Sequence, residues 1–147
     1  MKKTIFFILL ILTVTLSFNC SAHRGMGIGP VTTVMNIHDE LNTDLVDKGR
    51  ESFRLKCAEC HSFNSSLKGP ILHRVTERRR PEWIMNMILN PVQMVKTDPY
   101  AKELLIVYSI TMISPVTDVQ EARELLEYIR YMDENYDNIA GNNTINK

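Results

Sequence analysis

The feature that most constrains this chain is the segment Cys57-Ala-Glu-Cys60-His61. Two thiols separated by two residues, followed at once by a histidine, form the attachment signature of a c-type haem. Each thiol adds across one vinyl group of the porphyrin, and the histidine is thereby carried under the iron as an axial ligand. The segment therefore predicts one covalently bound haem c, with thioether bonds at Cys57 and Cys60 and with His61 on the iron.

Two other chemistries use paired cysteines. A structural zinc site needs two further ligands at a matching spacing, and the sequence has no second cysteine pair. A thioredoxin-like redox pair lies at the start of a helix after a strand, whereas this pair follows a helical pattern. Both alternatives are therefore less favoured than a haem.

The start of the chain is typical of an export signal. Lys2 and Lys3 precede an apolar run over residues 5–16, which is shorter than the roughly 18 to 20 residues of a membrane-spanning helix. We therefore predict an export signal over residues 1–19 and a mature chain outside the cytoplasmic membrane, on its periplasmic side. The alternative is that the run is a buried helix of the mature domain.

The end of this signal resembles a bacterial lipobox. In Leu16-Ser17-Phe18-Asn19-Cys20, Cys20 would carry the lipid and become the first mature residue, although Asn19 replaces the small residue usual before that cysteine. Cleavage after Ala22 is the competing interpretation. The lipobox interpretation predicts a lipid anchor on Cys20 that holds the protein at the membrane, and it also accounts for the third cysteine.

The rest of the chain is helical in pattern after a loose start. Residues 20–42 are rich in glycine and lack periodicity, which predicts a flexible tether. Helices are expected from Thr43 as cap to Cys57, over residues 82–90 after Pro81, from the Asp98-Pro99 start to Tyr108, and after a capping box at residues 117–120. Residues 138–147 are expected to be a polar tail. The prediction is one small all-α domain over residues 43–137.

Several segments together make the chain similar to class I cytochrome c. They are Gly49 and Phe53 ahead of the cysteine pair, Gly69-Pro70-Ile71-Leu72, the stretch Arg79-Arg80-Pro81-Glu82-Trp83-Ile84, Asn90-Pro91, Met94, Asp98-Pro99, Ala101-Lys102 and Leu104-Leu105. The resemblance covers about residues 44–136. It implies a small cytochrome c fold, with four or so helices wrapped around one haem. It also implies that the Pro70 carbonyl accepts the second ring N–H of His61, which would fix the tautomer of the ligand.

The resemblance implies a methionine as the sixth iron ligand, on a loop before the last helix. Met112 is in that position, and a thioether favours Fe(II) over Fe(III). Ile113 and Ser114 separate it from Pro115, whereas many relatives have proline directly after the ligand. Other candidates are Met85 and Met87 within a helix, Met94, which we expect near the haem edge, and His73, which we expect at the surface.

Basic and aromatic residues before the second helix could hydrogen-bond the haem propionates, which need donors when partly buried. The candidates are Arg78, Arg79, Arg80 and Trp83. The alternative for each arginine is a solvated basic turn.

The formal net charge is zero, with 17 basic and 17 acidic side chains, which argues against a nucleic-acid binder. The charges are unevenly distributed, because residues 48–80 are mainly basic and residues 98–137 mainly acidic. If these blocks become separate surfaces, they would steer the protein toward an acidic partner. We expect a one-electron carrier that exchanges electrons with redox partner proteins of a respiratory oxidoreductase. The alternatives are a haem subunit of a larger oxidoreductase, or a haem enzyme or gas sensor if Met112 does not bind the iron.

Overall fold

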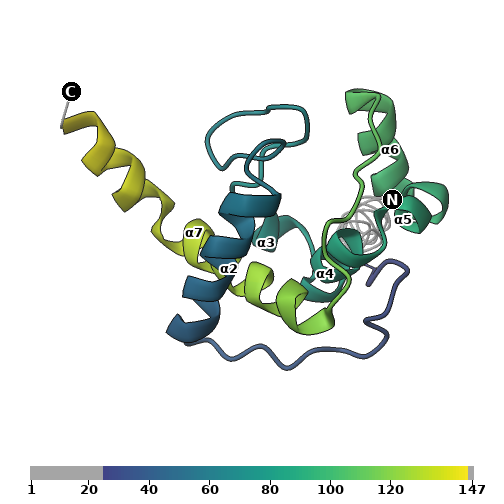
Figure 1. The fold of residues 1–147 in the computed structure, drawn as a ribbon, viewed down its shortest axis with the longest axis horizontal. Coiled ribbons are helices and arrows are strands. Elements are labelled where there is room, and N and C mark those ends of the chain that lie inside the picture. Colours follow the sequence, from purple (N-terminus) through teal and green to yellow (C-terminus); the bar gives the residue numbers. More distant parts are fainter. Residues whose placement is uncertain (1–24, 146–147) are drawn as a thin grey trace, which may run out of the picture.

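The computed structural model describes residues 25–145, and the side chains of residues 25–139. The helices, labelled as in Figure 1, are α2 (Thr43–Lys56), α3 (Val75–Arg78), α4 (Pro81–Leu89), α5 (Pro91–Thr97), α6 (Pro99–Tyr108) and α7 (Val119–Ile145). No strand occurs among the described residues. The predicted all-α fold is confirmed, with α3 and α5 as helices that the sequence analysis did not foresee.

Helices α2 and α7 form the principal helix pair and cross near the middle of the molecule (Figure 1). Gly49 lies at this crossing, directly against the backbone of α7 at Glu124. One turn later, the ring of Phe53 packs against Phe63 and Tyr128, with centroid distances of 5.3 Å and 5.4 Å. This packing fixes the end of α2, and therefore the position of the cysteine pair that follows it.

Prolines begin three consecutive helices on the other side of the core. Pro81, Pro91 and Pro99 are the first residues of α4, α5 and α6. The N–H of a first helical residue makes no hydrogen bond within the helix, so proline, which lacks this N–H, breaks none there. Asp98 caps α6 by accepting the N–H of Ala101 at 2.9 Å. The sequence analysis predicted the starts of α4 and α6, and it correctly ended α4 before Pro91.

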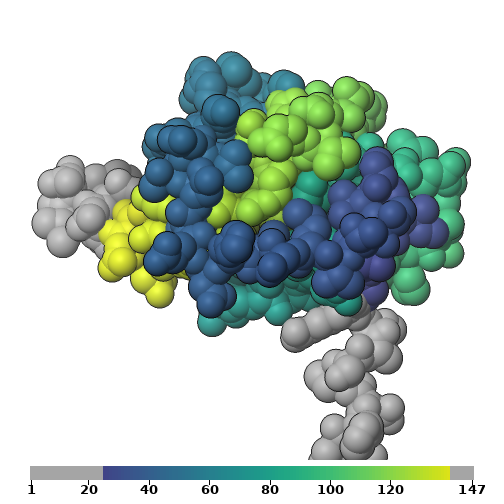
Figure 2. Space-filling model, turned by 90° about the horizontal axis from the view of Figure 1, so that it is seen from below, coloured from purple at the N-terminus to yellow at the C-terminus, as the bar shows by residue number. Residues whose placement is uncertain are grey.

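The N-terminal part of the domain differs from the expectation. The flexible tether predicted over residues 20–42 is wrong for residues 25–42, because Val31, Met35 and Ile37 pack against the core. We call residues 25–42 the N-terminal strap. Figure 2 shows it lying across one face of the molecule. Residues 20–24 are outside the described part.

Buried side chains of α4 and α5 bind the backbone of this strap. The Asn86 carboxamide accepts the N–H of Val31 and donates to the carbonyls of Met26 and Val31. Glu82 accepts the N–H of Met35 at 2.7 Å, and the Met94 sulfur accepts the N–H of Ile28 at 3.1 Å. Because these partners are far away in the sequence, local composition gave no sign that the strap would be ordered.

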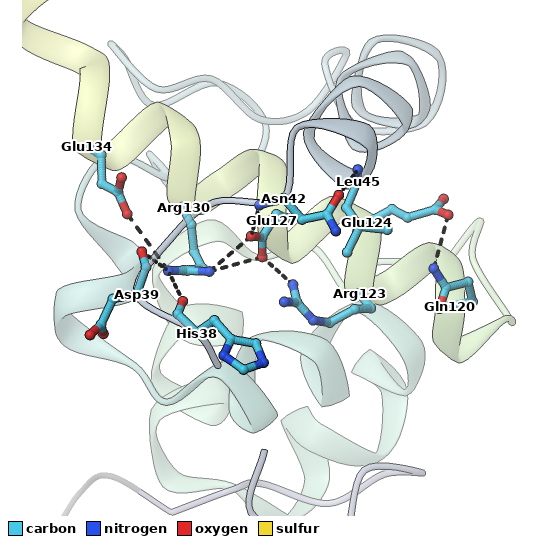
Figure 3. Close-up of polar contacts among 10 residues, drawn as sticks. All are labelled: His38, Asp39, Asn42, Leu45, Gln120, Arg123, Glu124, Glu127, Arg130 and Glu134. Atoms are coloured by element: carbon cyan, nitrogen blue, oxygen red, sulfur yellow. Dashed lines mark hydrogen bonds and ion pairs between the residues drawn. The ribbon is translucent and has the colours of Figure 1, made fainter. Parts of the chain in front are cut away.

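A fourth buried side chain, Glu127 of α7, holds the C-terminal end of the strap (Figure 3). It accepts the backbone N–H of Asn42 at 2.9 Å and pairs with Arg123 and Arg130. Arg130 also donates to the carbonyl of His38 at 2.9 Å. Glu127 therefore joins the strap, the start of α2 and two arginines of α7 in one network.

The structure corrects two expectations about helix caps and shows how far the last helix extends. Asn42, not Thr43, caps α2 through its side chain, which accepts the N–H of Leu45. Asp118 caps α7 by accepting the N–H of Glu121, so Thr117 is not the capping residue. The backbone of α7 continues to Ile145, into the segment expected to be a polar tail. No helix within residues 25–145 is both long and apolar enough to cross a membrane.

Candidate functional site

A cavity of about 340 Å³ lies between the end of α2, helices α4 and α6, the loop before α7, and α7 itself. Its walls are mainly apolar. The predicted site residues that line it are Cys57, Cys60, His61, Pro70, Trp83 and Met112. The tertiary structure therefore brings residues that span 56 positions of the chain to one chamber.

The cysteine pair is presented by a tight turn that continues from α2. The N–H groups of Cys57 and Ala58 both bond to the carbonyl of Phe53, at 2.9 Å and 3.0 Å. The N–H groups of Cys60 and His61 then both bond to the carbonyl of Cys57. This turn directs both thiols and the imidazole to the same cavity.

Burial controls the ionisation of the first thiol. Desolvation raises the pKa of Cys57 to about 11, and the negative charge of Glu121 acts in the same direction. The thiol is therefore protonated near neutral pH. A protonated thiol is less readily oxidised, because the thiolate is the reactive form of cysteine.

The imidazole of His61 is oriented by the loop that follows it. Its Nδ1 lies 3.1 Å from the carbonyl oxygen of Pro70, and because a carbonyl only accepts, Nδ1 carries the proton. Burial lowers the pKa of His61, while the bond to Pro70 opposes this effect. The ring is therefore neutral near pH 7 in this state, with Nε2 free to bind a metal.

Gly69 gives this ring the space it occupies. A β-carbon at Gly69 would lie 2.6 Å from Cε1 of His61 and 3.0 Å from its Nδ1. The Gly69 N–H donates to the carbonyl of Cys60 at 2.9 Å, which folds the loop back onto the cysteine turn. A side chain at position 69 would displace the imidazole from its place beside the cavity.

The methionines divide into two groups. Met112 and Met87 line the cavity, whereas Met85 and Met94 are buried away from it. Met94 does not line the cavity, and its sulfur accepts the N–H of Ile28 in the strap; its place near the haem edge stays a prediction. Met87 lies within α4, and Met112 lies on the loop between α6 and α7.

The residues predicted to contact the haem propionates differ in whether they line the cavity. Trp83 lines the cavity, and so does Arg78. The guanidinium of Arg79 lies 3.3 Å from the ring centroid of Tyr100, which also lines the cavity. Arg80 does not line it, because its Nε donates to the buried Glu82 at 3.1 Å.

Two remaining candidates lie elsewhere. His73 stacks on Tyr136 of α7, with ring centroids 4.1 Å apart, and it does not line the cavity. Among the described residues, no group of three or more His, Cys, Asp or Glu side chains could hold a metal ion, so a zinc site gains no further ligands there. Cys20 lies outside the described residues.

Comparison with solved structures shows the family. A cytochrome c from Rhodothermus marinus is 34% identical, with a TM-score of 0.70, over 73% of this chain and 91% of its own. The chain belongs to the cytochrome c family. An engineered form of the Rhodothermus marinus cytochrome c, bound to a carbene intermediate, is 36% identical, with a TM-score of 0.67, over 73% of this chain and 92% of its own. No family model and no curated protein matches the chain.

The prosthetic group of this cytochrome c is covalently bound haem c, which supports haem-based electron transport in general. The cavity fits the group in three respects. It has mainly apolar walls, it holds both thiols of the attachment segment, and Gly69 leaves the space beside His61. Both thiols of the attachment segment therefore line one cavity.

The charged blocks of the sequence face each other in this cytochrome c. Lys56 of α2 pairs with Glu121 of α7 at 2.6 Å, and Lys48 lies 4.0 Å from Glu124. Two lysines of the basic block are therefore matched by the acidic helix that crosses it. Along the cavity itself the charged side chains are all basic: Lys56, Lys68 and Arg78.

Sequence analysis did not single out several cavity residues. Tyr100, Tyr108 and Leu104 of α6, with Val95 of α5, form one wall. Their helical spacing predicts an apolar face, but the spacing does not tell which helix that face contacts. Only the packing of α5 and α6 beside α4 turns this face toward the cysteine pair.

Proposed function

We propose that this protein is a one-electron carrier whose haem iron is bound by His61 and Met112. The observation that carries the proposal is that both side chains line the cavity that holds Cys57 and Cys60. When bound, the haem supplies a reversible Fe(III)/Fe(II) couple. With both axial positions occupied, the iron has no open position for a small substrate, which favours electron transfer over catalysis.

Different residues of the chain orient the iron ligand, exclude water and bind the haem propionates. The Pro70 carbonyl orients the His61 ring and makes it a better electron donor to a metal through the N–H···O bond. The apolar walls exclude water, which limits the reorganisation that accompanies a change of charge at the iron. Trp83 and Arg78 supply donors at the edge of the chamber for the two carboxylates of the cofactor.

The sixth ligand is tested by absorption spectroscopy of the oxidised holoprotein. A methionine on Fe(III) gives a weak sulfur-to-iron charge-transfer band. We expect this band in the wild type, its loss in Met112→Leu, and its retention in Met87→Leu. The two variants are matched, because both residues line the cavity and both changes replace a thioether by an aliphatic chain of similar volume.

Two results would overturn the assignment. Loss of the band only in Met87→Leu would make Met87 the ligand. Absence of the band from the wild type, together with rapid binding of carbon monoxide to the reduced protein, would indicate an open iron and a haem enzyme or gas sensor. The engineered relative bound to a carbene intermediate shows that an engineered form of this fold can hold a reactive small molecule.

The proposal also includes export of the protein and its attachment to the membrane. Residues 1–19 would direct export, and a lipid on Cys20 would hold the domain at the periplasmic side of the membrane. Mass spectrometry of the mature N-terminus distinguishes a diacylated Cys20 from cleavage after Ala22. A protein that stays with membranes only when Cys20 is present supports the anchor; release of wild type and Cys20→Ser in equal amounts contradicts it.

The redox partner in this proposal is an acidic protein, or an acidic subunit of a larger oxidoreductase. The support is that the charged residues along the cavity are Lys56, Lys68 and Arg78. Lys56 and Lys68 pair with Glu121 and Glu59, whereas the side chain of Arg78 bonds only to the carbonyl of His73 among the described residues. Electron-transfer rates with such a partner fall as ionic strength rises. A second-order rate that rises with salt would contradict an acidic partner.

A further inference from the structure

Two loops border the haem cavity, one on each side. The loop over residues 62–72 follows His61, and the loop over residues 109–118 carries Met112. Tyr108, the last residue of α6, reaches across to the first loop, where its Oη lies 2.8 Å from Oγ of Ser66. Among the described residues no hydrogen bond joins the two loops directly, so Tyr108, which immediately precedes the Met112 loop, provides the connection.

The donor and acceptor roles in this contact follow from its neighbours. The Ser66 hydroxyl donates to the carbonyl of Gly69 at 3.2 Å, so its single proton is used there. Tyr108 must therefore donate to the Ser66 oxygen. The resulting chain of hydrogen bonds runs from Tyr108 through Ser66 to Gly69, whose backbone lies directly against the His61 ring.

The loop that carries Met112 has little else to hold it. Residues 110–115 make no backbone–backbone hydrogen bond with a described residue, and the side chains of Ile110 and Ile113 are exposed. At its far end, Val116 is buried and its N–H and carbonyl both bond to the Ser114 hydroxyl. At its N-terminal end, the loop begins directly after Tyr108, which is held by its hydrogen bond to Ser66.

We propose that Tyr108 and Ser66 are positioning residues that keep Met112 beside the cavity by tying its loop to the loop that follows His61. The inference rests on the proposed role of Met112 as iron ligand. In this chain no proline directly follows Met112, so a connection between the loops restrains the segment instead. Loss of either hydroxyl lets the loop move away more often and opens the sixth position to external ligands.

The test measures binding of imidazole to the oxidised holoprotein, because imidazole binds only when Met112 has left the iron. We expect Tyr108→Phe and Ser66→Ala each to raise the imidazole affinity and the binding rate about two- to tenfold, the range that loss of one hydrogen bond gives. The double variant should equal Ser66→Ala, because that change already removes the contact with Tyr108. Ser66→Thr keeps the hydroxyl and should behave as the wild type.

Controls separate this role from general destabilisation. Ser65→Ala removes a neighbouring exposed hydroxyl that bonds to Asn64 and not to Tyr108, and it should leave imidazole binding unchanged. In Tyr108→Phe and Ser66→Ala the unfolding free energy, measured with urea, should fall by no more than the gain in imidazole-binding free energy, because the same contact is lost on loop opening and on unfolding. A fall in unfolding free energy well beyond the gain in imidazole-binding free energy would show general destabilisation and overturn the inference.

The remaining outcomes also decide the question. If the wild type shows the sulfur-to-iron band but Ser66→Ala binds imidazole as the wild type does, or if the effects of the two single variants add in full, the inference is wrong and the proposed function stands. If the wild type lacks the band, Met112 is not the ligand, and the proposed function fails together with the inference.

Discussion

The backbone of Gly49 lies against the peptide group of Glu124, so that a β-carbon at position 49 would overlap the Glu124 carbonyl oxygen and lie 2.6 Å from its carbonyl carbon. Tyr128 closes the same space, with its Cβ 2.9 Å from that point. Because the obstacle is helix backbone, a side chain at this position cannot be accommodated by a change of rotamer. The distance between α2 and α7 is thus fixed by the absence of one methyl group.

Gly49→Ala should destabilise the protein in spite of a better helix propensity. Alanine in a helix gains up to about 1 kcal/mol over glycine, but forced separation of two packed helices costs about 1–3 kcal/mol or more. The net effect should be a lower free energy of unfolding, measured with urea. Gly25→Ala, where the nearest atom to a new β-carbon is 3.9 Å away, is the control. A Gly49→Ala protein more stable than the wild type would contradict this packing.

Gly69→Ala should weaken the hold of the fold on His61. The new methyl group would lie 2.6 Å from Cε1 of His61, so the ring or the loop must shift, at a cost of about 1–3 kcal/mol. We expect a smaller fraction of the purified chains to carry haem, and loss of the low-spin haem spectrum at a lower concentration of guanidinium. Wild-type values in both measurements would show that the loop yields without moving the imidazole.

The network around Glu127 predicts a specific dependence of stability on pH. Burial of Glu127 raises the pKa of its carboxyl, but the N–H of Asn42 and the charges of Arg123 and Arg130 outweigh burial and hold the pKa below its usual value of 4.5. Its contribution is therefore present at neutral pH and is lost as pH falls below about 4.5 toward the lowered pKa in the folded state. The cost of removing a charged partner from these hydrogen bonds is about 1.5–3 kcal/mol.

Glu127→Gln should accordingly lower the unfolding free energy near pH 7 by about 1.5–3 kcal/mol, and the difference from the wild type should shrink in acid. Urea titrations near pH 7 and below about pH 4 measure both quantities. Glu103→Gln is the matched control, because Glu103 is an exposed carboxylate of α6. A difference that is constant over this pH range would show that the charge of Glu127 does not stabilise the strap.

Asn86→Ala should release the N-terminal strap while leaving the haem cavity intact. The Asn86 side chain is fully buried and satisfies the N–H and carbonyl of Val31 and the carbonyl of Met26. An unpaired buried donor costs about 1–3 kcal/mol, so amide exchange at Val31 should accelerate by one order of magnitude or more. Gln93→Ala, on the exposed side of α5, is the control. Unchanged exchange at Val31 would mean that apolar packing alone orders the strap.

The sequence by itself determined the chemistry of this protein and the start of most of its helices. The spacing of Cys57, Cys60 and His61 is dictated by the spacing of the vinyl groups and the iron, so a local pattern is sufficient to identify the cofactor. Pro81, Pro99 and Asp98 act on the backbone within one turn, and they therefore mark helix starts from the sequence alone.

Only the tertiary structure determined which residues that are distant in the sequence contact one another. Composition could not reveal that residues 25–42 are ordered, because the buried groups that bind them, Asn86, Glu82 and Glu127, are 47 to 85 residues away. Nor could it separate Arg78, which faces the cavity, from Arg80, which pairs with Glu82. The hydrogen bond between Tyr108 and Ser66 and the pairing of α2 with the acidic face of α7 likewise join residues that are distant in the sequence. Such relations depend on how helices pack, and they become visible only when the chain is folded.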